Sequence, residues 1–212
     1  MKLYKYRGLQ GLDRTLDIVL NERIYCAEYI DLNDPFEGML NVIVSRGSEY
    51  PMPYGSHYGM SEYQQMSITE AAPDVSSTRV GSLCGAMNDV RMWALYADSF
   101  SGIAIELDID QGTPELHKVD YDDRLPRLDP FVGEKVVSEN VLTKKTSHWR
   151  YEEEYRIITT SEYFGFPGMV TAIYLGARVS DIHRTIFEKI VPDIPIIDTQ
   201  LDRKKIAVFA KN

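Results

Sequence analysis

The chain has 212 residues and a net charge of -9, with 44% hydrophobic and 26% charged residues. This length and composition suit a globular protein with a real hydrophobic core in one domain. The acidic charge argues against a general nucleic-acid binder, because affinity for phosphate backbones comes largely from Lys and Arg. Cys26 and Cys84 lack the spacing of a metal site or of a disulfide framework. We expect a cytoplasmic protein with no membrane span and no bound metal.

Strands outnumber helices in the predicted order, which indicates an α+β domain built on a mixed or antiparallel sheet. We expect one domain over residues 1–212, with an insertion at about 46–80. The predicted strands cover residues 3–7, 24–27, 40–45, 82–87, 103–109, 118–121, 155–160, 170–175, 194–197 and 205–209. The predicted helices cover residues 12–21, a short segment after Asn88 and Asp89, residues 131–142 and residues 182–191.

Residues 82–108 form the most informative stretch, with a strand, a short helix, a turn and a strand in succession. Met92, Leu95 and Tyr96 recur at helical spacing and predict one apolar helix face. In residues 103–109, large apolar residues alternate with Ala104, Glu106 and Asp108. This period of two predicts a strand with one buried face.

The insertion at about 46–80 is rich in Tyr, Gly, Ser, Met and Pro. A long irregular stretch of this kind is typical of a functional loop or a lid. Its tyrosines can stack on a flat ligand, anchor the loop to the protein or form an oligomer contact, and anchoring is the favoured interpretation. These tyrosines are Tyr50, Tyr54, Tyr58 and Tyr63.

Three segments carry candidate binding chemistry. Arg7 ends the first strand with a planar fork of donors that suits a carboxylate or a phosphate. Residues 33–38 form a turn with Asn, Asp and Pro. If a strand begins near Tyr151, then Glu152, Glu154 and Arg156 share one face. That face is either a solvated, salt-bridged surface or the wall of a cleft in which Arg156 keeps a carboxylate ionised.

Six motifs in this order resemble the bacterial and phage domain-of-unknown-function family 2971. They are LYKYR, NDPFEG, MWALYAD, SGIAIELD, WRYEEEYRI and IYLG, and they span residues 3–176. The chain departs from the family's usual pattern at Tyr155, where a tryptophan is more typical, and in its Tyr-rich insertion.

The layout of these strands also resembles that of ADP-ribosyltransferase-type folds, which implies that the chain uses NAD as a substrate. The resemblance implies that Arg7 binds the diphosphate or ribose, that Tyr96 or Trp93 stacks on nicotinamide, and that Glu154 is catalytic. Glu152 is the substitute for Glu154. A fixed carboxylate suits this chemistry, since cleavage of the nicotinamide–ribose bond develops oxocarbenium charge. The cofactor-binding residues expected on this basis are Tyr6, Arg7, Asn33, Asp34, Ser82, Trp93, Tyr96 and Arg156.

The main alternative is a non-catalytic module that senses a ligand or binds a protein in phage–host conflict. This alternative predicts that Glu152, Glu154 and Arg156 are saturated by partners within the protein. A hydrolase with His148 or His57 as its base is a third interpretation, although no nucleophile motif supports it. The expected partner is a small nucleotide ligand, and the acceptor of a transferred group stays open among protein, nucleic acid, small molecule and water.

Overall fold

The computed structural model describes residues 1–10, 12–46, 61–73, 77–202 and 207–211. These residues combine strands and a few helices, so the predicted α+β class is confirmed. The chain divides into two compact units, and each is assembled from separate stretches of chain. Unit 1 comprises Met1–Ala27, Arg79–Val119 and His148–Asn212, and unit 2 comprises Glu28–Thr78 and Asp120–Ser147.

A large mixed sheet forms the frame of unit 1, with β1 between β6 and β7 in antiparallel pairing. The pairing of β14 with β15 is parallel, whereas β14 and β7 are antiparallel. In spatial order the strands are β16 (Ala207–Ala210), β15 (Ile196–Asp202), β14 (Val170–Leu175), β7 (Ile103–Asp108), β1 (Lys2–Arg7), β6 (Arg79–Cys84), β12 (Glu154–Thr159) and β8 (Leu116–Lys118). The remaining strands are β3 (Ala27–Glu28), which pairs with β6, and the separate pair of β2 (Arg23–Tyr25) with β13 (Tyr163–Gly165).

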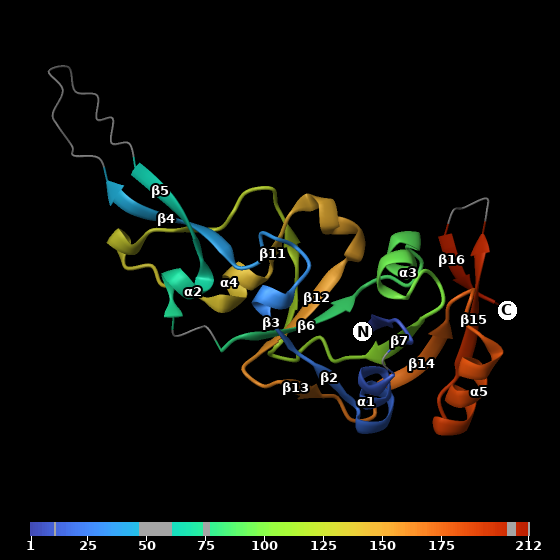
Figure 1. Ribbon diagram of the computed structural model, residues 1–212. Coiled ribbons are helices and arrows are strands. Elements are labelled where there is room, and N and C mark those ends of the chain that lie inside the picture. The colour runs from blue at the N-terminus through green and yellow to red at the C-terminus, as the bar shows by residue number, and fades with distance from the viewer. Residues whose placement is uncertain (11, 47–60, 74–76, 203–206, 212) are drawn as a thin grey trace, which may run out of the picture. The chain divides into compact units, whose positions relative to one another are not determined.

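Helices cover both faces of this sheet (Figure 1). On one face, Leu3 of β1 packs in a core that includes Ile18 and Phe187. On the other face, Tyr6 packs in a second core that includes Trp93. Successive residues of β1 therefore face two different cores, as the period of a strand requires. The helices are α1 (Asp13–Asn21), α3 (Val90–Tyr96), α5 (Asp181–Ile190) and the 3-10 helix η4 (Ser147–Glu152).

The prediction that β7 has one buried face is wrong, because all its residues except Asp108 are buried. Ala104 packs in the core that contains Trp93, and Glu106 is only 2% exposed. The predicted apolar face of α3 is also partly wrong, since Leu95 is 61% exposed. In both cases segments that are distant in the sequence decide which side is covered.

The turn between α3 and β7 depends on a very close approach of backbone segments. Asp98, Ser99 and Phe100 all have left-handed backbone angles, with φ of 49°, 52° and 72°. Next to this turn, the Gly176 N–H donates to the Gly102 carbonyl at 2.9 Å. A Cβ atom on Gly176 would lie 2.3 Å from the Phe100 carbonyl oxygen. The glycine of the IYLG motif is therefore required by packing of main chain against main chain.

Unit 2 is built around β4, which pairs antiparallel with β5 and parallel with β10. The prediction that residues 46–80 are irregular is wrong in part, because they contain all of β5 and α2. Tyr50, Tyr54 and Tyr58 lie outside the described residues, and the Tyr63 ring contacts Arg127 at 5.4 Å. The elements are η1 (Tyr29–Asp31), β4 (Met39–Arg46), β5 (Ser61–Ser67), α2 (Ile68–Ala71), β9 (Asp120–Tyr121), β10 (Arg127–Leu128), η3 (Pro130–Val132), α4 (Ser138–Leu142) and β11 (Lys144–Lys145).

Two further predictions about secondary structure are corrected. The helix predicted over residues 131–142 is two short pieces, η3 and α4, separated at Gly133, which has a φ of 81°. The strand predicted over residues 118–121 is two strands, β8 and β9, which belong to different units.

We predict that Gly102→Ala lowers the free energy of unfolding by about 3 kcal/mol. Its Cβ atom would lie 2.3 Å from the Arg7 carbonyl oxygen and 2.8 Å from the Ala97 carbonyl oxygen. Both obstacles are backbone atoms, so neither can rotate away. Urea denaturation checks this loss. The control is Gly112→Ala, because a Cβ atom there would lie no closer than 3.5 Å to its nearest neighbour, which is an ordinary contact. Equal stability of the two variants would contradict the proposed clash of Gly102→Ala with the backbone.

Candidate functional site

The centre of the candidate site is a buried ion pair on β12. Glu154 and Arg156 lie two residues apart on the strand, so both project from the same face. Arg156 Nε donates to Glu154 Oε1 at 2.9 Å, and Nη2 donates to Oε2 at 3.0 Å. The exposed fractions of the two side chains are 0% for Arg156 and 5% for Glu154. This bidentate contact fixes the carboxylate as an anion in one orientation.

Glu152 reaches the same region from η4 instead of from the strand predicted to begin near Tyr151. The chain turns at Glu153, whose φ is 43°, and β12 begins at Glu154. Glu152 is 4% exposed, and its Oε1 accepts a hydrogen bond from the Tyr96 hydroxyl at 2.5 Å. Burial and this hydrogen bond both raise the pKa of Tyr96, so the phenol keeps its proton. Glu152 and Glu154 therefore have different principal partners.

Tyr6 and Trp93 form the packed layer beside these carboxylates. Their rings meet edge to face, with centroids 5.3 Å apart. Trp93 is fully buried, and its indole N–H donates to the Met87 carbonyl at 2.7 Å. The Tyr6 hydroxyl donates to the Ala86 carbonyl at 3.0 Å. Both rings are therefore part of the core. Among the predicted ligands, Tyr96 is the partly exposed aromatic residue that contacts one of the carboxylates.

The register of the sheet aligns polar residues that the sequence analysis did not assign to a site. Cys84 of β6 lies opposite Tyr4 of β1 and opposite Glu154, and Tyr4 also lies opposite Glu106 of β7. The four side chains therefore form one row on the sheet face that carries Glu154. Ser82 lies opposite Arg156, one step along the strands. The spacing of two residues along each strand could have indicated which side chains share a face. The sequence does not show which strands pair, so it could not align these residues in one row.

Glu106 is saturated by donors from two strands, β1 and β14. Its Oε1 accepts from Thr171 at 2.7 Å and lies 2.9 Å from Lys2 Nζ. Its Oε2 accepts from the hydroxyls of Tyr4 at 3.2 Å and Tyr174 at 3.1 Å. Burial alone would raise the pKa of Glu106, but these contacts outweigh burial and the pKa is lowered. Glu106 is an ionised structural carboxylate.

Arg7 does not share a sheet face with Glu154, contrary to the expected common site. Tyr4 and Tyr6 project toward the core with Trp93, so Arg7 and Lys5 project to the opposite face with Leu3. Lys5 Nζ donates to the Ser82 carbonyl at 2.7 Å. One ligand group cannot contact both Arg7 and Glu154 across a continuous sheet.

Asn33 and Asp34 belong to unit 2, whereas the other predicted ligands belong to unit 1. Asp34 is 3% exposed, and its Oδ2 accepts from the backbone N–H and the hydroxyl of Thr146, both at 3.4 Å. Lys145 Nζ donates to Asn33 Oδ1 at 3.2 Å and lies 3.8 Å from Glu37 Oε1. Within unit 2 these residues hold the NDPFEG turn in place by buried polar contacts.

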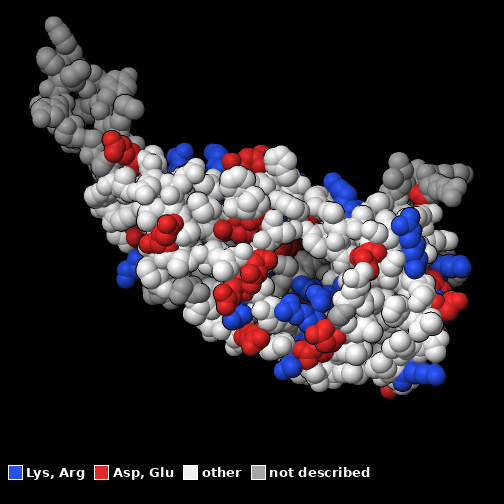
Figure 2. Space-filling view, in the orientation of Figure 1, with Lys and Arg blue, Asp and Glu red and all other residues white. Residues whose placement is uncertain are grey.

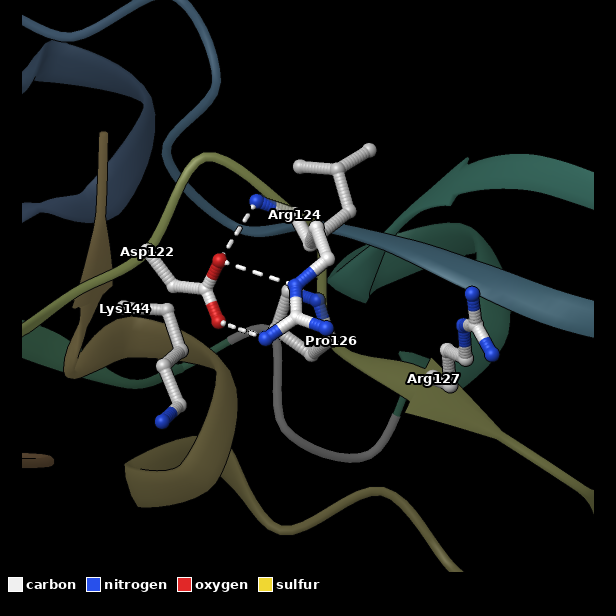
Figure 3. A pocket seen from close by; sticks show the side chains of 6 residues that line it. Asp122, Arg124, Pro126, Arg127 and Lys144 are labelled. Carbon is white, nitrogen blue, oxygen red and sulfur yellow. Dashed lines mark hydrogen bonds and ion pairs between the residues drawn. The ribbon is translucent and has the colours of Figure 1, made fainter. Parts of the chain in front are cut away.

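A pocket of about 230 Å³ also lies within unit 2, with charged residues around Leu125 and Pro126. Figure 3 shows the Asp122 carboxylate facing the Arg124 guanidinium, with distances of 3.1 Å to Nε and 2.9 Å to Nη2. Lys144, another lining residue, forms an ion pair with Asp120. Much of the positive charge of this pocket is therefore neutralised by neighbouring carboxylates.

The described residues contain no group of three or more His, Cys, Asp or Glu side chains suited to a metal ion. Likewise, none of the helices in the described part of the chain is long and apolar enough to cross a membrane. Acidic and basic side chains are interspersed on the face drawn in Figure 2. Burial raises the pKa of the Cys84 thiol to about 12, so this cysteine has no thiolate character near neutral pH.

Comparison with protein-family models, curated proteins and solved structures finds no match for this chain.

We predict that Arg156→Met lowers the free energy of unfolding by about 3–5 kcal/mol, because Glu154 loses its cation in a buried position. In Glu154→Gln/Arg156→Met the charge is removed from both sides, so the double variant should lose less than the sum of the two single variants. Chemical denaturation of all four proteins measures the coupling. Arg91→Met is the control, since the Arg91 side chain is 59% exposed in its ion pair with Asp89. An exposed pair of this kind should contribute under about 1 kcal/mol. Additive losses would contradict a coupled pair.

A second prediction concerns the pH dependence contributed by Lys5. Burial, with Arg7 nearby, lowers the pKa of Lys5 to about 8 in the folded protein. The unfolded chain has the ordinary value of about 10.4, so it binds the proton more tightly than the folded protein between these two pH values. The wild type should therefore gain stability relative to Lys5→Met as the pH rises from about 8 to about 10.4. Thermal denaturation across this range checks the sign, and a constant difference between the two proteins would contradict it.

Proposed function

We propose that unit 1 is an NAD-using, ADP-ribosyltransferase-like enzyme that cleaves the nicotinamide–ribose bond. The observation that supports this proposal best is the gathering of predicted site residues on one face of the sheet. Glu154 and Arg156 of β12, Ser82 of β6 and Tyr6 of β1 share that face through the strand register. Tyr96 joins them through its bond to Glu152. The resemblance of the strand layout to ADP-ribosyltransferase-type folds is the reason for naming NAD.

In this proposal, Glu154 stabilises the positive charge that develops on the ribose as nicotinamide leaves. Arg156 holds the carboxylate ionised and oriented through two hydrogen bonds. Glu152 is placed to assist, with the Tyr96 hydroxyl as its donor.

Nicotinamide stacking is assigned to partly exposed aromatic residues near Glu152. Tyr96 and Tyr151 meet this condition, whereas Trp93 is fully buried against Tyr6. The Arg91 guanidinium carbon lies 4.1 Å from the centre of the Tyr151 ring. Trp93 supports the site from behind by fixing Tyr6. Arg7 has no part in this reaction, because it projects from the opposite face.

The second candidate is a non-catalytic module that senses a ligand or binds a partner protein. It is favoured by one observation, which is that Glu154 and Arg156 are buried and bind each other through both carboxylate oxygens. Glu152 likewise has the Tyr96 hydroxyl as a partner. Saturation of this kind is what the non-catalytic interpretation predicts.

Calorimetric titration with NAD, combined with measurement of nicotinamide release, tests the two candidates. We predict that Glu154→Gln binds NAD with similar affinity but releases nicotinamide at least about 100-fold more slowly, because the charge on the developing cation is no longer offset. Glu152→Gln should reduce the rate less.

The matched control is Glu153→Gln, which removes one carboxylate between these two positions but from an exposed side chain. Its rate should equal that of the wild type. Absence of NAD binding in the wild type would overturn the enzymatic proposal. NAD binding without nicotinamide release in any protein would favour the sensing module.

A further inference from the structure

The sheet face opposite Glu154 carries a cluster of positive charge between β1 and α1. Lys5 and Arg7 project from this face of β1, two residues apart. Arg14 of α1 adds a third cation, which lowers the pKa of Arg7 together with the larger effect of burial. Arg14 Cζ lies 4.0 Å from the centre of the Tyr25 ring. The three cations are therefore close enough to repel one another.

The acidic residues near this cluster do not balance it. Asp13 is the carboxylate that acts on Arg7, and Glu154 acts on Lys5 but is itself bound by Arg156 through both oxygens. Asp17, one turn further along α1, holds Arg23 Nε with both carboxylate oxygens at 3.0 Å. The cluster of Lys5, Arg7 and Arg14 is thus left with an excess of positive charge, in a chain whose net charge is -9.

Two buried donors at this place lack an acceptor. Arg7 Nε and Thr15 Oγ1 are buried, and neither makes a hydrogen bond within the described structure. Thr15 has an exposed fraction of 0% and lies on the buried face of α1 with Ile18. Ile18 packs in the same core as Leu3, so this helix face is turned toward the β1 face that carries Arg7. An unsatisfied buried donor is unfavourable, so each of these groups needs an explanation.

The beginning of α1 supplies a third, independent feature. The helix has nine residues, and its N-cap is Leu12, which provides no capping hydrogen bond from its side chain. The first N–H groups of a helix have no partner within the helix and carry partial positive charge. These backbone donors lie in the same turn of α1 as Arg14 and Thr15.

We propose that Lys5, Arg7, Arg14 and Thr15 form a binding site for a phosphate group, free or as a phosphate monoester. A tetrahedral oxyanion with two negative charges offsets the excess of two positive charges that three cations and Asp13 leave. Its several oxygens accept from a planar guanidinium, a hydroxyl and the first N–H groups of a helix at the same time. Arg7 and Lys5 project from the sheet face opposite Glu154, so the proposal does not rest on the proposed NAD chemistry.

Titration of the full chain with inorganic phosphate tests the site, with sodium chloride at equal ionic strength as the reference. Phosphate should raise the melting temperature in a saturable manner. In NMR spectra, the backbone amide signals of Arg14 and Thr15 should move with the same dissociation constant. A parallel titration with ribose 5-phosphate distinguishes a free ion from a monoester, since tighter binding of the ester would identify the esterified group as the ligand.

Three variants locate the binding groups. Arg7→Met should weaken phosphate binding about tenfold or more, because a charged donor is lost. Thr15→Val, which keeps the shape of the side chain, should raise the melting temperature without phosphate and weaken binding about threefold. If Thr15 had only a structural role, Thr15→Val would change the melting temperature but not the phosphate affinity. Arg23→Met removes the same charge from the neighbouring β2 and should leave phosphate affinity unchanged.

Three results would overturn the proposal. The first is an equal effect of chloride and phosphate on the wild type. The second is unchanged phosphate affinity in both Arg7→Met and Thr15→Val. The third is that phosphate shifts the amide signals of residues distant from the beginning of α1 and leaves those of Arg14 and Thr15 unchanged. If Arg7→Met does not fold, the Thr15→Val titration and the amide signals still decide the outcome.

Discussion

The need to neutralise buried charge governs one face of the large sheet. Glu106, Glu154 and Arg156 are between 0% and 4% exposed, and an unpaired charge in such a position would cost several kcal/mol. Arg156 neutralises Glu154 within β12, whereas Glu106 draws its donors from β1 and β14. A shift of β1 by one residue would move Tyr4 away from Glu106 and would bring Lys5 to the wrong face. The charges therefore specify the register of the central strands.

This constraint bears on function in two ways. A catalytic carboxylate must be ionised and held in place, and the bidentate contact of Arg156 supplies both conditions to Glu154. The same contact would equally satisfy a purely structural carboxylate. Glu152 differs, since its partner is the neutral hydroxyl of a partly exposed tyrosine, Tyr96.

The sequence predicted the fold class and the positions of many strands, because alternation and turn residues are local signals. It could not predict that both faces of β7 are covered, since the cover comes from helices and strands far away in the chain. Residues 61–67, SEYQQMS, carry no apolar alternation, and only pairing with β4 makes them a strand. That Asn33 and Asp34 belong to a different unit from the other predicted ligands likewise follows from long-range contacts, which divide the chain into units.

The assignment of Tyr6 and Arg7 to one site conflicts with the geometry of a strand, since adjacent residues project to opposite faces. In the structure, this alternation separates two electrostatic environments. The Tyr6 face holds carboxylates whose charge is matched by Arg156, Lys2 and hydroxyl donors. The Arg7 face holds cations whose charge Asp13 matches only in part, and Arg7 Nε has no acceptor in the described structure. A ligand at the first face must compete with an existing partner, whereas an anion at the second face would complete an arrangement that is otherwise unfavourable. The basic end of β1 is therefore better understood as a site in its own right than as part of the carboxylate site.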